Sequence, residues 1–236
     1  MMHDLPDKIQ QLIKNIEYLH INSSDPLIKL VSESEICAQD VRNIANHDHP
    51  AENSYGRKML YKGKNFVVFL MTWNQDDFTA IHSHGSTDWG CVYFLGKIDH
   101  RLYNAHNLSI TLANKSIIPD RTIVSVTGNL VHAMGNLSKE PSYSLHIYGS
   151  GSNVSIPNDG AFVYEIEKQQ IRETDGSASI NVPESVCKST TTGLKTDKET
   201  LIDFLNIVLP YYVKNENQRM IDLIKNALNY PDDFLN

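Results

Sequence analysis

The chain has 236 residues, of which 41% are hydrophobic and 21% charged, a composition typical of a soluble globular protein of one or two domains. Its net charge of −7, without a run of Lys or Arg, gives no electrostatic support for binding nucleic acid or an anionic membrane. No stretch approaches the ~20 apolar residues of a membrane-spanning helix, and the first ten residues lack the apolar region of a signal peptide.

The three cysteines, Cys37, Cys91 and Cys187, are odd in number and widely spaced. This pattern fits neither a disulfide framework nor a zinc knuckle. We therefore expect a protein of the reducing cytoplasm.

Residues 1–50 are predicted to form a helical segment packed on the rest of the fold. Leu12, Ile13, Ile16 and Leu19 recur at helical spacing, and a second amphipathic stretch runs from about residue 28 to 44. The sequence His-Asp-His-Pro at 47–50 then breaks the helical pattern.

Residues 51–170 have the pattern of a β domain. Short apolar runs, such as 66–73, 91–95 and 144–148, alternate with Gly, Asn, Asp and Pro. Many short strands at this spacing predict an all-β barrel or sandwich.

The remaining chain is divided into a polar and an apolar part. Residues 171–199 are polar and poor in aromatic side chains, which predicts a linker or an extended surface segment. The helical period returns over 200–236, with Leu201, Phe204, Leu205 and Val208. We expect two helices there, packed on the barrel or on a partner chain, which would make a homo-oligomer.

The first chemical signal is the pair His82 and His84. Two histidines separated by one residue on a strand point to the same face, so their imidazoles can converge on one ion. The alternative is a pair of surface or core histidines. A third histidine, His132, follows a glycine turn and precedes Asn136 by four residues.

These two segments, about fifty residues apart, match the two-motif layout of the cupin superfamily. We therefore predict a mainly β cupin (jelly-roll) barrel with N-terminal helices and a C-terminal helical extension, in which His82, His84 and His132 hold one metal ion. The Glu that many cupins supply as a fourth ligand is absent from residues 86–91. Asp88 is more typical of a turn, and Cys91 is more typical of a buried strand thiol than of a ligand.

Residues 55–148 also resemble the cysteine dioxygenase family of thiol dioxygenases. The similarity rests on four segments in the family's order: Tyr55–Tyr61, Ile81–Gly85, His132–Asn136 and Ser144–Tyr148. The pattern Ser-x-His-x-Tyr in the last segment is the most specific of the four.

The resemblance implies a function and a role for each site residue. His82, His84 and His132 would bind Fe(II), and the enzyme would oxidise a small thiol, L-cysteine, with O2 to a sulfinic acid. The family's outer-sphere catalytic triad would be Ser144, His146 and Tyr148. Arg57 would bind the substrate carboxylate, Tyr55 would share the face of Arg57, and Trp89 would lie near the pocket.

Three departures from the family pattern keep alternatives open. The family's cross-linking cysteine is replaced by Trp89 or Gly90, so no Cys–Tyr cross-link is expected. Trp89, Gly90 and Gly149 resemble 3-mercaptopropionate dioxygenases instead, although Arg57 favours cysteine. The alternatives are therefore a dioxygenase or oxidase of another small thiol and a non-catalytic metal-binding sensor.

Overall fold

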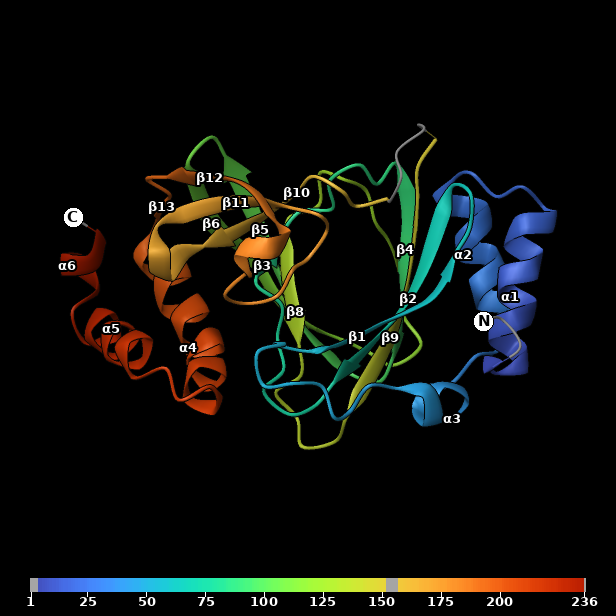
Figure 1. Ribbon diagram of the computed structural model, residues 1–236, viewed down its shortest axis with the longest axis horizontal. Helices are drawn as coiled ribbons and strands as arrows, with labels where there is room; N and C mark the ends of the chain where they lie inside the picture. Colours follow the sequence, from blue (N-terminus) through green and yellow to red (C-terminus); the bar gives the residue numbers. More distant parts are fainter. Residues whose placement is uncertain (1–3, 152–156, 236) are drawn as a thin grey trace.

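The computed structural model describes residues 4–151 and 157–235, so the predicted segments that include residues 1–3, 152–156 and 236 lie in part outside the described residues. Two β-sheets form the centre of the fold, with helices on both outer sides (Figure 1). The smaller sheet has the order β1 (Gly56–Lys62), β2 (Phe66–Trp73), β9 (Ser142–Gly149), β4 (Trp89–Leu95) and β7 (Ile123–Ser125).

The larger sheet contains eight strands and carries the two histidine segments of the sequence analysis. Its order is β12 (Cys187–Thr192), β11 (Gln170–Thr174), β10 (Ala161–Glu165), β3 (Ile81–His82), β8 (His132–Gly135), β5 (Ile98–His106), β6 (Ser109–Ile118) and β13 (Lys195–Thr196). Its paired strands are antiparallel except for β13, which runs parallel to β6. The inner faces of the two sheets enclose one apolar cluster that includes Phe69, Trp73, Phe94 and Met134.

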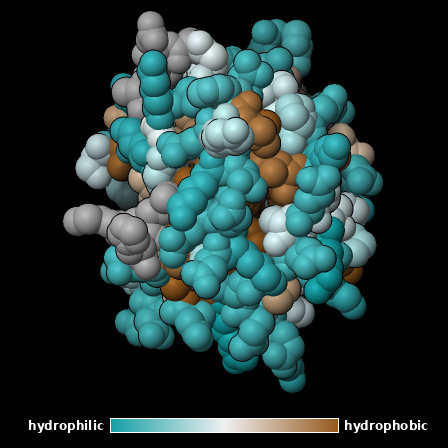
Figure 2. All heavy atoms as spheres, turned by 90° about the vertical axis from the view of Figure 1, so that its right-hand side faces the viewer, coloured by the Kyte–Doolittle hydropathy of each residue, from teal (hydrophilic) through white to brown (hydrophobic). Residues whose placement is uncertain are grey.

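The N-terminal helices cover the outer face of the smaller sheet. They are α1 (Asp7–Tyr18), α2 (Ser24–Glu33), the short α3 (Ala38–Val41) and the 3-10 turn η2 (Arg42–Ile44). The buried residues of α1, Ile9, Leu12, Ile13 and Ile16, pack in one cluster with strands β2, β4 and β9. Hydrophilic side chains accordingly cover most of this side of the molecule (Figure 2).

The C-terminal helices cover the outer face of the larger sheet. They are α4 (Lys198–Lys214), α5 (Gln218–Asn229) and α6 (Pro231–Leu235). The Asp197 carboxylate accepts a hydrogen bond from the Thr200 amide at 2.8 Å, which fixes the beginning of α4. Its residues Leu201, Phe204 and Leu205 belong to one apolar cluster with Ile81 of β3. These helices therefore bury their apolar faces within the same chain.

The predicted fold class is confirmed in its architecture, because the described residues form a mainly β barrel of two sheets with N-terminal helices and a C-terminal helical extension. The prediction of a linker over 171–199 is wrong. This segment supplies most of β11 and all of β12 and β13, so it extends the larger sheet at both of its edges. Its side chains are polar because strand β12 lies at an edge with one half-buried and five exposed residues. Among the described residues, no helix is both long and apolar enough to cross a membrane.

Candidate metal centre

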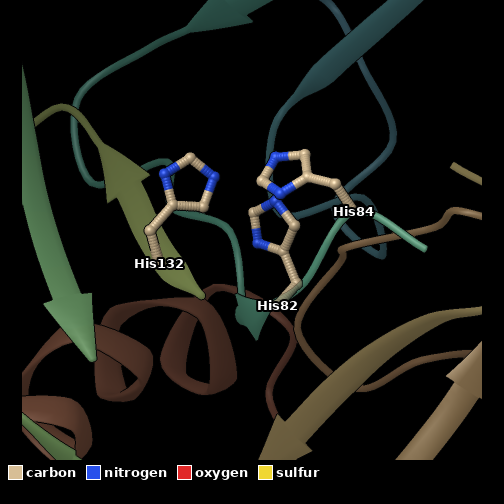
Figure 3. Close-up of side chains that lie close together, drawn as sticks. All are labelled: His82, His84 and His132. Carbon is tan, nitrogen blue, oxygen red and sulfur yellow. The ribbon is translucent and has the colours of Figure 1, made fainter. Parts of the chain in front are cut away.

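Three buried histidines lie together inside the barrel. His82 ends β3 and His132 begins β8, and the two residues are direct cross-strand partners. His84 follows β3, and its ring centroid lies 4.8 Å from that of His132 and 5.1 Å from that of His82. The three rings turn toward one another (Figure 3), and one nitrogen from each lies within 4.8 Å of the others.

The hydrogen bonds of the three rings assign their free nitrogens. Nδ1–H of His82 donates to the Ala80 carbonyl at 3.0 Å, and Nδ1–H of His84 donates to the Leu130 carbonyl at 3.1 Å. A neutral imidazole that donates from Nδ1 has its lone pair on Nε2. The Nε2 atoms of His84 and His132 are buried without a hydrogen-bond partner among the described residues. Unpaired buried acceptors that converge on one point fit a bound metal ion.

Burial also keeps these rings neutral. It lowers the pKa of His82 to about 4, with smaller contributions from His100 and Arg57. Burial, followed by the neighbouring histidines, lowers the pKa of His84 and His132 well below the ordinary value. Metal binding requires the neutral imidazole, so this environment removes competition from protons near neutral pH.

A fourth histidine, His100 of β5, supports the third ligand. Its Nε2 lies 2.8 Å from Nδ1 of His132, and it is 7% exposed. Since His132 must donate from Nδ1 to free its Nε2, His100 accepts this hydrogen bond and carries its own proton on Nδ1. Burial lowers the pKa of His100 to about 4, which keeps it neutral. The sequence analysis did not identify His100, because a lone histidine in a strand belongs to no recognisable motif.

The predicted triad lies on the inner face of β9, in the smaller sheet. Ser144 Oγ is 2.7 Å from Nε2 of His146, and Nδ1 of His146 is 2.6 Å from the Tyr148 hydroxyl. Trp73 Nε1 donates to Ser144 Oγ at 2.9 Å, which adds a residue that sequence reasoning did not include. Tyr148 approaches the metal ligands, with its ring centroid 5.6 Å from that of His84.

The donors and acceptors available on these side chains set the direction of each hydrogen bond in the triad. Trp73 can only donate, so the buried Ser144 hydroxyl accepts from it and finds its own acceptor in Nε2 of His146. His146 is neutral because burial lowers its pKa to about 3, so its one proton is on Nδ1 and points to Tyr148. The Tyr148 hydrogen is then free to donate into the cavity. Burial raises the pKa of Tyr148, which keeps this hydroxyl protonated.

Two of the three clustered histidines and two residues of the triad, His146 and Tyr148, line one small cavity. Its volume is about 20 Å³. The lining residues are Tyr55, Arg57, Met71, Trp73, Thr79, His82, Ser83, His84, Met134, His146, Tyr148, Asn158, Gly176 and Ala178. A ligand that reaches the three histidines must therefore be small. His132 is not in this lining and contacts the site through its ring neighbours His82 and His84.

Arg57 and Tyr55 both line this cavity. Arg57 is the cross-strand partner of Met71, which also lines the cavity, and its guanidinium carbon lies 4.2 Å from the ring centroid of Phe69. Arg57 is exposed overall and has no acidic partner within the described residues. Tyr55 is buried and stacks on Trp73, with ring centroids 5.1 Å apart. Arg57 is therefore a free cation at the edge of the cavity.

The structure contradicts the prediction that Trp89 lies near the pocket. Gly90 pairs with Tyr148, so Gly90 shares the inner face of the sheet, and its neighbours Trp89 and Cys91 point outward. Both belong to the cluster beneath the N-terminal helices. Burial raises the pKa of the Cys91 thiol to about 12, and its position excludes it as a metal ligand or as a partner of Tyr148.

Two further polar residues of the motifs have structural roles. Asp88 accepts hydrogen bonds from the Ser150 hydroxyl at 3.1 Å and from the Gly151 amide at 2.7 Å, which is a turn contact. The Asn136 amide donates to the carbonyls of Trp73 and Glu140. Neither residue belongs to the histidine cluster, so the centre has three protein ligands among the described residues.

No family model matches the chain. An uncharacterised conserved Klebsiella pneumoniae protein with a double-stranded β-helix domain aligns at 15% identity over 45% of this chain and 85% of its own, with a TM-score of 0.37. The cupin domain of Schizosaccharomyces pombe Cnp3 aligns at 12% identity over 41% and 61%, with a TM-score of 0.34. Oxalate decarboxylase of Bacillus subtilis aligns at 15% identity over 58% and 33%, with a TM-score of 0.39.

Proposed function

We propose that the protein is an Fe(II)-dependent thiol dioxygenase that oxidises L-cysteine with O2 to cysteine sulfinic acid. The observation that carries this proposal is the meeting of two motifs in one cavity. The three-histidine centre of the larger sheet faces the hydrogen-bonded triad of the smaller sheet, and members of both line the same cavity, namely His82, His84, His146 and Tyr148.

The ligand set fits this chemistry. Three neutral imidazoles leave coordination positions open and offset none of the charge of a divalent ion, so an anionic ligand such as a thiolate is favoured. Fe(II) bound there would lower the pKa of a thiol and bring it together with O2. The reaction balances without a further reductant, because RSH and O2 give RSO2H, with both oxygen atoms on sulfur.

The remaining residues of the site orient the substrate. The Tyr148 hydroxyl donates a hydrogen bond toward the reacting atoms, and its direction is set by His146, Ser144 and Trp73. Arg57 binds the carboxylate of the substrate, since a guanidinium with no acidic partner at the cavity edge can give two parallel hydrogen bonds.

A second candidate substrate is 3-mercaptopropionate, which shares the thiol and the carboxylate that these residues bind. The similarity at Trp89, Gly90 and Gly149 does not favour it, because a Cβ on Gly149 would lie 2.0 Å from the outward-facing Trp89 ring. The combination of Trp89 with Gly149 therefore reflects packing outside the cavity, where the Trp89 ring leaves no room for a side chain at position 149. A non-catalytic metal-binding sensor remains the third reading.

Oxygen uptake by protein loaded anaerobically with iron tests the proposal. L-cysteine and 3-mercaptopropionate are supplied separately, and the product mass is read in parallel. We expect uptake with L-cysteine and a gain of two oxygen atoms. His132→Ala is the control, because it should abolish both iron binding and uptake. Stoichiometric iron with no uptake for either thiol would support the sensor instead.

A further inference from the structure

Asn158 lines the cavity and has one polar atom that no described residue pairs with. It lies in the loop before β10, it is 5% exposed, and it lines the cavity. Its Nδ2 donates to the Gly176 carbonyl at 3.1 Å. Its Oδ1 is buried without a hydrogen-bond partner among the described residues.

The surrounding backbone fixes this orientation. The amide nitrogen has to face the Gly176 carbonyl, so the oxygen occupies the other side of the amide group. Gly176 has a φ of +98°, and a Cβ there would lie 2.3 Å from Asn158 Nδ2. A Cβ on Gly85, directly after the ligand His84, would lie 2.3 Å from the Asp159 carbonyl. The backbone thus passes closely on both sides of Asn158, which restricts the orientation of its side chain.

The other polar groups of the cavity show which ligand group is missing. Ser83 Oγ already accepts from the Phe162 amide, and Thr79 Oγ1 already accepts from the Met134 amide. None of the described lining residues is acidic. Asn158 Oδ1 is therefore a side-chain acceptor with no partner among the described residues, in a cavity whose other polar groups are Arg57, tyrosine and other hydroxyls, and the histidines. An unpaired buried acceptor is costly, so it matches a ligand that brings an N–H donor.

We propose that Asn158 Oδ1 accepts a hydrogen bond from the amino group of the substrate and selects an α-amino thiol over its des-amino analogue. The inference rests on the proposed function, and it assigns the choice between L-cysteine and 3-mercaptopropionate to one residue. Arg57 binds the carboxylate that both thiols carry, and Asn158 accepts a hydrogen bond from the amino group, which L-cysteine has and 3-mercaptopropionate lacks.

The test is equilibrium binding to anaerobic, iron-loaded protein, measured by calorimetry without turnover. The probes are L-cysteine, cysteamine, which lacks the carboxylate, and 3-mercaptopropionate, which lacks the amino group. Asn158→Gly removes the acceptor, and glycine tolerates the φ of +72° at this position. Asn107→Gly is the matched control, because Asn107 has a φ of +52° in an exposed turn between β5 and β6.

We expect the wild type to bind L-cysteine about 10- to 100-fold more tightly than 3-mercaptopropionate, on the scale of a hydrogen bond to a charged group. Asn158→Gly should weaken L-cysteine and cysteamine by about that factor and change 3-mercaptopropionate by less than about twofold. Asn107→Gly should leave all three affinities unchanged. If Asn158→Gly does not fold, the ratio of the wild-type affinities for L-cysteine and 3-mercaptopropionate still tests the proposal, because it should lie between about 10 and 100.

Equal weakening of all three thiols, or no weakening, would overturn the role of Asn158. Equal wild-type affinities for L-cysteine and 3-mercaptopropionate, together with oxygen uptake, would also overturn it but leave the dioxygenase proposal intact. Failure of the iron-loaded wild type to bind any of the three thiols would overturn both.

Discussion

The side-chain hydrogen bonds around the histidines decide which nitrogen each ring offers. Two ligands donate to backbone carbonyls, which cannot be changed by mutation, whereas His132 donates to the side chain of His100. This makes His100 a positioning residue whose contribution can be measured separately. Residues that orient a ligand in this way commonly contribute 10- to 100-fold to metal affinity.

We predict that His100→Ala weakens metal binding by about 10- to 100-fold, because Nδ1–H of His132 loses its acceptor and its ring loses its fixed orientation. Competition with a chelator measures this affinity. His100→Gln offers an amide oxygen as acceptor and should restore part of the loss, which a purely structural role would not explain. His106→Ala, at an exposed position of the same strand, is the control. Equal affinities of His100→Ala and the wild type would contradict the assignment.

The residues that could be predicted at this scale share a local pattern. Strand alternation alone places Ser144, His146 and Tyr148 on one face, and the structure agrees. Trp89 was misplaced because its face depends on the register of β4 against β9, which sets Gly90 and not Trp89 opposite Tyr148. His100 and Asn158 come from distant segments, so no local spacing could identify them.

The turn between strands β10 and β11 of the larger sheet contains a buried acid. Glu167 lies in the 3-10 turn η3 (Ile166–Lys168), and the Tyr212 hydroxyl of α4 donates to its Oε1 at 2.7 Å. Its Oε2 is buried without a partner among the described residues. Burial, and then the neighbouring Glu165, raises the pKa of Glu167 from 4.5 to about 7. The contact between η3 and α4 therefore favours the protonated carboxyl.

We predict that this contact loses stability as the pH rises. The pKa is higher in the folded state, so its stabilisation is complete below about pH 4.5 and is lost as the pH passes through about 7. Glu167→Gln imitates the protonated carboxyl. It should equal the wild type at pH 4.5 and exceed it by about 3 kcal/mol in free energy of unfolding at pH 8. Urea unfolding at both pH values measures this difference.

The exposed Glu140 supplies the control for this pH dependence, because Glu140→Gln should leave the difference between the two pH values as in the wild type. A constant difference between Glu167→Gln and the wild type across the pH range would show that the carboxyl does not change its protonation on unfolding.

The polar strands were the least predictable elements. Strand β12 reads Cys-Lys-Ser-Thr-Thr-Thr, with no apolar alternation, because it lies at the edge of the larger sheet and its side chains face solvent. Hydrophobic periodicity detects a strand only through its buried face. The three consecutive threonines, which favour extended backbone, were the signal in the sequence.

The whole molecule has three layers of apolar packing around the two sheets. One cluster lies between the sheets, one beneath the N-terminal helices and one beneath the C-terminal helices. The third cluster contains Phe204 of α4 together with Ile81, the residue before the ligand His82. The C-terminal helices are thus continuous with the packing that positions β3, although the sequence only indicated that they bury against something.

The final prediction tests this continuity. Phe204 is 1% exposed, so Phe204→Ala should lower the free energy of unfolding by about 3–5 kcal/mol, whereas Phe162→Ala, at a 44% exposed position of β10, should lower it by less than about 1 kcal/mol. Two spectroscopic probes separate the barrel from the C-terminal helices. Both tryptophans, Trp73 and Trp89, lie in the smaller sheet, on the other side of the barrel from α4. Their fluorescence therefore reports the barrel, while far-ultraviolet circular dichroism includes the helices. If the layers form one cooperative unit, the Phe204 variant shifts both transitions together. A shift seen by circular dichroism alone would mean that the C-terminal helices unfold independently of the barrel and do not hold His82 in place.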